Sequence, residues 1–336
     1  MENKTEQSNY KIVGFITLAL RLVIGWTYFS AFWRRLILEN KLIETEAGYI
    51  GEKFNHFLPN ALGIKPVIEY LVSNPDQLWW AMVIFTIIEG IVGLLLMFGF
   101  FTRLMSIGVI SLAMGILLGS GWLGTTCLDE WQIGVLGVAG GLVLFLSGSG
   151  YFSIDNYFID KKYPFTIKKS YKWLASGNLD FKKLKHPIAV AAFLTLGLTL
   201  FTNQYFHGGV YGTLHNKSVK PKLELSNASF NEMLQFDVMR VEGADVYGSF
   251  LIGIQLLNDG KIVKEWNQTD LSNFNEKHIK NKYVAKIKPG AHSLMIPLGA
   301  KATISLIVGD LTKFKNKNLE LKLIDISGAS WNIKVQ

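Results

Sequence analysis

The sequence predicts a membrane α-helical bundle of about five transmembrane helices, followed by an all-β, sandwich-like domain in water. Three observations support this fold class. Of 336 residues, 49% are hydrophobic and only 18% are charged, whereas a soluble domain carries about 25% charged residues. Long apolar runs continue to about Gln204, and beyond it polar and apolar residues alternate in short segments. We therefore expect a transmembrane domain at residues 1–206 and an extracytoplasmic β domain at residues 207–336.

Five apolar segments are each close to the ~20 residues that cross a hydrocarbon core. They are residues 12–31, 78–97, 104–122, 132–152 and 187–205. The first segment has the position of a secretory signal peptide, but it carries Arg21 and no small-residue cleavage pattern follows it. We therefore expect it to remain in the protein as the first span.

Lysines predict how the bundle lies in the membrane. The connection between the fourth and fifth segments is rich in lysine, with Lys161, Lys162, Lys168, Lys169, Lys172, Lys182, Lys183 and Lys185. The positive-inside rule places such a loop in the cytoplasm. Counting along the chain then puts the N-terminus in the cytoplasm and the β domain outside the inner (cytoplasmic) membrane. Most tryptophans fall near the outer interface, as an aromatic belt requires, namely Trp33, Trp79, Trp80, Trp122 and Trp131, with Trp173 as the exception.

The last third of the chain predicts an all-β module. Residues 250–257 lead into Asn258-Asp259-Gly260 and the apolar pattern resumes at Ile262, which is a strong hairpin signal. Further strands are expected at residues 223–225, 234–239, 293–296, 303–308, 319–324 and 331–335. Their spacing suits a sandwich with Greek-key connections. The module contains no evident catalytic cluster, so by itself it would be a binding or interaction domain.

Several familiar redox and metal motifs are absent from the sequence. It contains one cysteine, no C-x-x-C-H haem motif and no H-E-x-x-H zinc motif. Residues 119–124 match the G-x-G-x-x-G dinucleotide fingerprint, but they end a membrane helix instead of joining a strand to a helix. No metal, haem or flavin is therefore predicted. The net charge of +8 lies largely in the lysine-rich loop, where it suits anionic lipid, and nucleic acid is not an expected partner.

The loop at residues 125–131 contains the most informative residues. It holds the single cysteine, Cys127, followed by Asp129, Glu130 and Trp131. In one interpretation Cys127 is a small buried apolar residue and the two acids cap the fourth helix. In the other, Cys127 is a sulfur nucleophile, the carboxylates handle protons, and Trp131 stacks on a ring. The sequence leaves both open.

Charged residues also occur in or near the apolar segments. Arg34 and Arg35 follow the first segment at the predicted outer face, where their forked donors could bind an oxyanion or snorkel to the lipid headgroups. Arg21 and Glu89 lie near the middle of their segments, where a lone charge is costly, so we expect them to form an ion pair. This pair could be structural, or it could carry protons or orient a substrate. His207 lies at the same outer face and is either a loop residue or part of a site.

Three segments resemble a known family. They are residues 121–134 (GWLGTTCLDEWQIG), residues 21–26 (RLVIGW) and the turn at residues 98–103 (FGFFTR). Together they are similar to DoxD, a subunit of thiosulfate:quinone oxidoreductase with a four-helix DoxX-like core. Residues 203–212 (NQYFHGGVYG) and the following Leu214-His215-Asn216 resemble the start of the partner subunit, DoxA. The chain therefore resembles a fusion of the two subunits.

This resemblance implies oxidation of two thiosulfates to tetrathionate, with a membrane quinone as diffusible co-substrate. The residues suggest roles within that activity. Catalysis would involve Cys127, Asp129 and Glu130; thiosulfate would contact Arg34, Arg35, Arg21 and His207; quinone would contact Trp131, Trp26 and Glu89. The expected partners are thiosulfate, quinone, the bilayer and, as one option, a second copy of the chain. Two alternatives stay open: a non-catalytic membrane anchor that carries a β interaction module, and a quinone-linked enzyme for another reduced sulfur anion.

Overall fold

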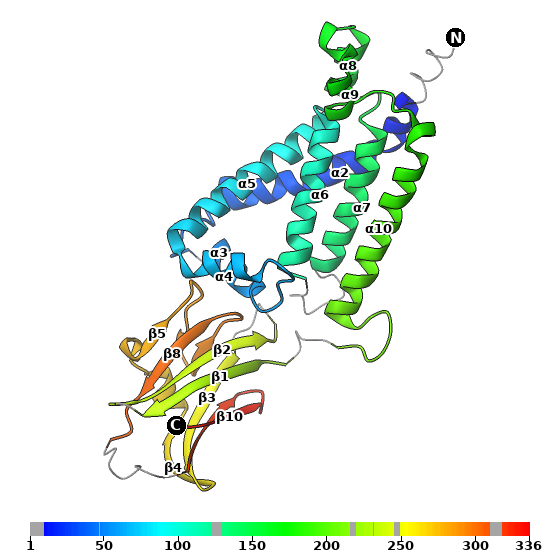
Figure 1. Ribbon diagram of the computed structural model, residues 1–336. Coiled ribbons are helices and arrows are strands. Elements are labelled where there is room, and N and C mark those ends of the chain that lie inside the picture. Colours follow the sequence, from blue (N-terminus) through cyan, green and yellow to red (C-terminus); the bar gives the residue numbers. More distant parts are fainter. Residues whose placement is uncertain are drawn as a thin grey trace. The chain divides into compact units, whose positions relative to one another are not determined.

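The computed structural model describes residues 10–46, 48–121, 130–215, 220–230, 232–244, 249–309 and 318–336 (Figure 1). The chain divides into two compact units. The helical unit takes its described residues from Met1–Tyr49, Trp80–Leu118 and Glu130–Leu214. The β unit takes them from Ile50–Trp79, Gly119–Asp129 and His215–Gln336. Residues 50–79 of the β unit therefore come from the N-terminal half of the sequence.

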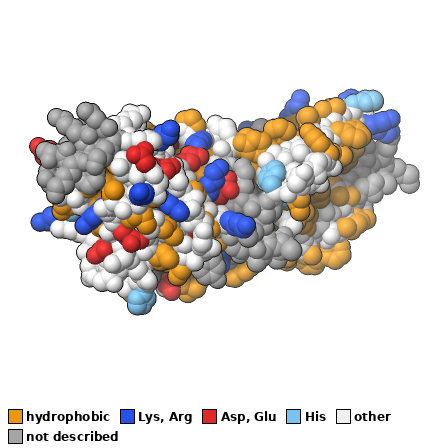
Figure 2. All heavy atoms as spheres, turned by 90° about the horizontal axis from the view of Figure 1, so that it is seen from below, with side chains coloured by type: hydrophobic (Ala, Val, Ile, Leu, Met, Phe, Trp, Pro, Cys, Tyr) orange, Lys and Arg blue, Asp and Glu red, His pale blue; other side chains and the backbone are white. Residues whose placement is uncertain are grey.

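Within the described residues, four helices are long and apolar enough to cross a membrane: α5 (Pro75–Phe98), α6 (Thr102–Gly119), α7 (Glu130–Ser147) and α10 (Phe181–His207). A fifth span is formed if the bent pair Tyr10–Ile16 and Leu18–Leu38 counts as one; its two parts meet at 55°. In this pair α2 (Leu18–Phe32) continues as the π-helical segment η1 (Trp33–Leu38). The prediction of a multi-pass membrane bundle is confirmed. Figure 2 shows the exposed hydrophobic side chains on one face of the molecule.

Glycines allow the spanning helices to approach one another closely. A Cβ added at Gly93 of α5 would overlap the backbone of α2 at Phe29, and one at Gly25 of α2 would overlap the Met97 side chain. On α7, a Cβ at Gly137 would overlap Ala113 of α6 and lie 3.2 Å from the Tyr28 hydroxyl of α2. Small residues at such crossings are typical of membrane helix packing, where close van der Waals contact replaces the hydrophobic effect.

The connection between α7 and α10 closes one end of the bundle. We call this end of the bundle the lysine-rich end. This connection contains α8 (Ile154–Asp160), the 3₁₀ turn η2 (Pro164–Ile167) and α9 (Lys169–Leu174). The buried Asp155 carboxylate accepts hydrogen bonds from the backbone nitrogens of Phe101 (2.9 Å) and Thr102 (3.0 Å), at the start of α6. Arg103 donates to the carbonyl oxygens of Phe145 (2.9 Å) and Gly177 (2.8 Å). These contacts place the start of α6 and the end of α7 together, so residues near the other ends of these helices lie at the opposite end.

The β unit contains two antiparallel sheets. One has the strand order β1-β2-β8-β5, and the other has the order β10-β9-β3-β7-β6, with β4 also paired to β3. The strands are β1 (Lys222–Phe230), β2 (Leu234–Glu242), β3 (Ser249–Asn258), β4 (Lys261–Trp266), β5 (Ile279–Asn281), β6 (Lys288–Pro289), β7 (Leu294–Ile296), β8 (Lys301–Leu306), β9 (Leu319–Asp325) and β10 (Ser330–Lys334). The predicted hairpin is confirmed: β3 and β4 pair around Asp259 and Gly260, whose φ values of 47° and 79° are those of a tight primed turn.

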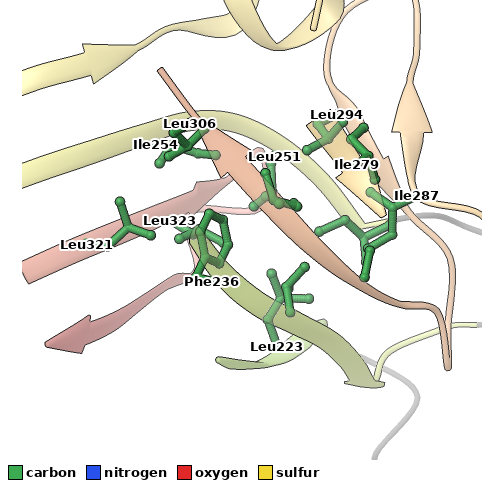
Figure 3. Close-up of a cluster of buried hydrophobic side chains, with 14 of the residues drawn as sticks. Leu223, Phe236, Leu251, Ile254, Ile279, Ile287, Leu294, Leu306, Leu321 and Leu323 are labelled. Carbon is green, nitrogen blue, oxygen red and sulfur yellow. The ribbon is translucent and has the colours of Figure 1, made fainter. Parts of the chain in front are cut away.

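The core of the β unit is formed by alternating apolar side chains from both sheets. Figure 3 shows Phe236 of β2 and Leu306 of β8 among side chains from the other sheet, including Leu251 of β3 and Leu323 of β9. On β8, buried and half-buried residues alternate strictly, as expected for a strand with one face on the core. The described part of the unit also contains the helices α3 (Ile50–Phe57), α4 (Lys65–Ser73) and α11 (Gln268–Ser272) and the 3₁₀ turn η3 (Glu276–His278).

Candidate functional site

A buried charged pair joins α2 to α5 through the η1 extension. The Nη1 atom of Arg35 lies 2.5 Å from Oε2 of Glu89 and donates to the Thr86 hydroxyl at 3.2 Å. Glu89 is 3% exposed, and it lies near the middle of the 24-residue helix α5. Because Thr86 and Glu89 are three residues apart, they share one face of that helix. One guanidinium therefore contacts two polar groups on this face of α5.

The predicted pairing of Arg21 with Glu89 is wrong. Arg21 is 1% exposed and donates from Nη1 to the carbonyl oxygen of Ser149 at 2.6 Å and from Nη2 to that of Phe152. Both carbonyls follow α7 at the lysine-rich end. Arg21 therefore satisfies backbone acceptors after a helix C-terminus, where a cation is favoured, and Arg35 neutralises Glu89 in its place.

Adjacent arginines differ in their surroundings. Arg34 is exposed and donates from Nε to the Ser30 carbonyl oxygen one turn earlier, at 3.3 Å. The Arg35 side chain is 18% exposed and points to α5. Both arginines were predicted to contact thiosulfate. Within the described part of the chain, Arg35 reaches the buried Glu89–Thr86 cluster and Arg34 does not.

A second cluster lies between α7 and α10, at the end of the bundle opposite the lysine-rich end. The indole nitrogen of Trp131 donates to the Thr202 hydroxyl at 2.9 Å, and the Trp131 and His207 rings meet edge to face with centroids 5.2 Å apart. Trp131 is the second residue of α7, whereas Thr202 and His207 lie in the last turns of α10, so the two helices run antiparallel. His207 is 8% exposed. From the sequence we predicted that Trp131 contacts quinone and that His207 contacts thiosulfate. In the structure these two side chains contact each other.

The remaining predicted site residues are placed as follows. Glu130 is the first residue of α7 and half-buried, where its charge favours the helix N-terminus. Trp26 lies on α2 with 56% of its surface exposed, and its ring centroid is 6.0 Å from that of Phe29. Cys127 and Asp129 lie outside the described residues.

Two polar residues of these clusters were not predicted from the sequence. Thr86 and Thr202 each contribute a hydroxyl to one of the clusters. A threonine in an apolar helix most often bonds its own backbone, as Thr202 also does with the Leu198 carbonyl oxygen at 2.7 Å. The sequence signal for Thr86 is its position three residues before Glu89, which places both residues on one face of the helix.

Comparisons with protein families show what this chain is related to. The family model described as TQO small subunit DoxD matches residues 16–182, and the one described as TQO small subunit DoxA matches residues 206–334. The chain belongs to the DoxD and DoxA families. The resemblance to a fusion of the two subunits is thereby confirmed, and both families are subunits of thiosulfate:quinone oxidoreductase. No solved structure matches the chain.

The two clusters lie in different parts of the family matches. Arg35, Thr86 and Glu89 all lie in the DoxD match. Trp131 lies in the DoxD match, Thr202 lies between the matches, and His207 lies at the start of the DoxA match. The second cluster therefore connects the DoxD part to the first residues of the DoxA part.

Proposed function

We propose that this DoxD–DoxA fusion oxidises two thiosulfate dianions to tetrathionate and reduces one membrane quinone to its quinol. The observation that carries the proposal is the match of both family models within one chain. The overall change takes two electrons from the thiosulfate sulfurs, forms one S–S bond, and adds those electrons and two protons to the quinone. The protein must therefore hold anions close together, admit an apolar acceptor from the bilayer and deliver protons.

Arg35 is our proposed anion-binding residue. Two thiosulfate dianions a few ångströms apart repel each other strongly at low dielectric, so a nearby cation is needed. The Glu89 carboxylate and the Thr86 hydroxyl hold one end of the Arg35 guanidinium, and the forked donors on its other atoms suit an oxyanion. Holding the side chain in place lowers the entropy lost on binding.

Glu89 is our proposed proton carrier for quinol formation. A carboxyl group buried in a membrane bundle is costly and is usually functional, and Glu89 lies in α5, one of the helices long and apolar enough to cross a membrane. The Trp131–His207 pair would supply an aromatic wall and an imidazole for the quinone ring. Glu130, and Asp129 as predicted from the sequence, would pass protons at the same end.

Cys127 is proposed as the sulfur that links the two half-reactions. Its thiolate and one thiosulfate would give two electrons to the quinone and form a Cys127–S–S–SO₃⁻ adduct. A second thiosulfate would attack the thiosulfate-derived sulfur bound to Cys127, releasing tetrathionate and regenerating the thiolate, as in thiol–disulfide exchange. Direct electron transfer from bound thiosulfate to quinone is the competing mechanism.

The test uses the purified full chain in detergent with a short-chain soluble quinone. We expect quinone absorbance to fall on adding thiosulfate, with tetrathionate formed in a one-to-one ratio to quinol. Reduction with sulfite or sulfide but not with thiosulfate would assign the protein to another sulfur anion. No reduction with any of the three donors would favour a membrane anchor carrying an interaction module.

A further inference from the structure

A helical segment of the DoxD part packs against the DoxA part inside the β unit. Helices α3 and α4 belong to residues 50–73, within the DoxD match, whereas β5 to β8 belong to residues 279–306, within the DoxA match. We call residues 50–73 the docking hairpin. More than two hundred residues of sequence separate the two contacting groups, for example Asn55 and Ala285, which are 230 apart.

Three consecutive residues of the DoxA part bond to the docking hairpin. The Tyr283 hydroxyl donates to Oε1 of Glu69 at 2.6 Å. The next two backbone nitrogens donate to the Val72 carbonyl oxygen at 3.2 Å and to Oδ1 of Asn55 at 3.3 Å; they belong to Val284 and Ala285. One short backbone segment thus bonds to both helices of the hairpin.

These contacts are buried. Asn55 and Ala285 are 0% exposed and Val72 is 1% exposed. If the docking hairpin left the DoxA part, the Asn55 side chain and two backbone N–H groups would lose their partners, which is unfavourable unless water replaces them. A buried asparagine that bonds to a distant backbone indicates a specific interface instead of incidental contact.

The backbones also approach closely at Gly299. A Cβ added there would overlap the carbonyl oxygen of Asn55, and the Gly299 φ of +74° already favours glycine. The Lys301 ammonium lies 5.9 Å from the centre of the Tyr283 ring, which places a cation on the ring that reaches Glu69. The surface of the DoxA part is therefore shaped to fit α3.

We propose that the docking hairpin is the binding surface for the DoxA-like domain and that this non-covalent contact holds the domain even without the chain connection before β1. The partner that fits it is a β domain of DoxA type carrying the Tyr283–Ala285 segment and Gly299. The inference rests on the family matches and these contacts, and it stands whether or not the protein oxidises thiosulfate.

The test uses the full chain with a specific-protease site inserted after Leu214, beyond the end of α10, and an affinity tag at the N-terminus. After cleavage in detergent, we expect the fragment from residue 215 to 336 to stay with the tagged helical part through extensive washing. If the fragment elutes at once after cleavage, the docking hairpin is not sufficient and the proposal is wrong.

Two glycines of similar backbone conformation supply a matched pair of variants. Gly299→Ala would strain φ and collide with Asn55, whereas Gly260→Ala would strain a φ of +79° in the β3–β4 turn with no atom within 4 Å of the new Cβ. We expect the cleaved Gly299→Ala fragment to dissociate at least about tenfold faster than the Gly260→Ala fragment. Equal rates for the two would overturn the proposal.

Tyr283→Phe provides a second measurement if Gly299→Ala yields no folded protein. The phenyl ring keeps the packing and removes only the hydrogen bond to Glu69. We expect the cleaved fragment to dissociate about fivefold faster than the parent fragment. A matched control is Ser272→Ala, because in the described part of the chain the Ser272 hydroxyl bonds only within α11, to the Thr269 carbonyl oxygen. If Tyr283→Phe and Ser272→Ala behave alike, the Tyr283–Glu69 contact does not hold the domain.

Discussion

At the scale of single residues, Arg34 and Arg35 show that neighbours in sequence can have different roles. We predict that Arg35→Ala lowers the stability of the bundle, because it leaves Glu89 buried without a counter-charge; breaking such a pair costs about 3–5 kcal/mol. Thiosulfate-dependent quinone reduction should fall about 10- to 100-fold, the effect of losing one hydrogen bond to a charged group. Thermal unfolding and steady-state rates in detergent would measure both effects.

The matched control for this prediction is Arg34→Ala. Arg34 is exposed and, among the described residues, its side chain bonds only to the Ser30 backbone carbonyl one turn earlier, so its removal should change stability by less than about 0.5 kcal/mol. Equal losses in the two variants would mean that Arg35 acts through general surface charge. Glu89→Gln should destabilise the protein while Arg21 keeps its bonds to the Ser149 and Phe152 carbonyl oxygens.

Cys127 carries a second prediction at this scale. Cys127→Ser keeps nearly the same volume, so a packing role should survive it. A nucleophilic role should lose almost all turnover, because a hydroxyl is a far poorer nucleophile than a thiolate near neutral pH. Alkylation of Cys127 should also be slowed by thiosulfate if the thiol lies at the substrate site. A Cys127→Ser protein with turnover close to the parent would favour direct electron transfer.

The sequence correctly predicts that Glu89 needs a counter-charge, but the predicted partner, Arg21, is wrong and Arg35 takes that position. The reason is local geometry. After Phe32 the helix widens into the π-helical segment that contains Arg35, and hydropathy does not reveal such a change in helical turn. The carbonyl acceptors of Arg21 follow α7, and no sequence pattern predicts contacts between residues about 130 positions apart.

At the scale of elements, Asp237 on β2 connects several strands of the first sheet. Its carboxylate accepts hydrogen bonds from Lys282 (2.9 Å), Asn227 (2.9 Å) and Thr303 (2.5 Å), which lie after β5, on β1 and on β8. Partial burial by itself would raise the pKa of Asp237, but these hydrogen bonds and the Lys282 charge outweigh it, so the pKa lies below its usual range.

A pH dependence follows from the lowered pKa of Asp237. A carboxylate whose folded-state pKa is depressed contributes stability above its unfolded pKa of about 3.9, and this contribution is lost as pH falls through the folded value. Asp237→Asn should therefore weaken the sheet at pH 7 and make little difference in strong acid. Hydrogen exchange of peptides from β1, β2 and β8 at several pH values would measure the change. A difference from the parent that is the same at every pH would contradict the prediction.

Elements were predicted unevenly from the sequence. The β3–β4 hairpin and most of the longer strands follow from local alternation and turn chemistry, which depend on neighbouring residues. The short strands β5 (Ile279–Asn281) and β6 (Lys288–Pro289) were missed, because pairs of two or three residues are held by their partners in the sheet and not by their own propensity. The docking hairpin was assigned only to a connection between spans, since its apolar residues are buried by a domain that follows much later in the chain.

At the scale of the whole molecule, the composition and the apolar runs sufficed to predict a membrane bundle followed by a β domain, because the bilayer itself dictates the length of each span. The grouping of residues 50–79 with the β unit could not be predicted in that way. It depends on contacts between distant segments, for which the sequence has no periodic signal.

The orientation of the bundle gives the last prediction. Eight lysines lie between Lys161 and Lys185, in the connection from α7 to α10, and the positive-inside rule predicts that this lysine-rich end faces the cytoplasm. Because α10 crosses the membrane once more, a reporter fused after Gln336 should be active only if it functions outside the inner membrane. A reporter fused after Gly177 should be active only if it functions in the cytoplasm.

Replacing the lysines of the connection from α7 to α10 with glutamine should weaken this orientation preference, whereas the same change at Lys261 and Lys264 on β4 should leave it intact. Activity of a cytoplasm-only reporter at Gln336 would invert the orientation. It would place Arg35, Trp131 and His207 on the cytoplasmic side, where thiosulfate would have to be supplied from within the cell.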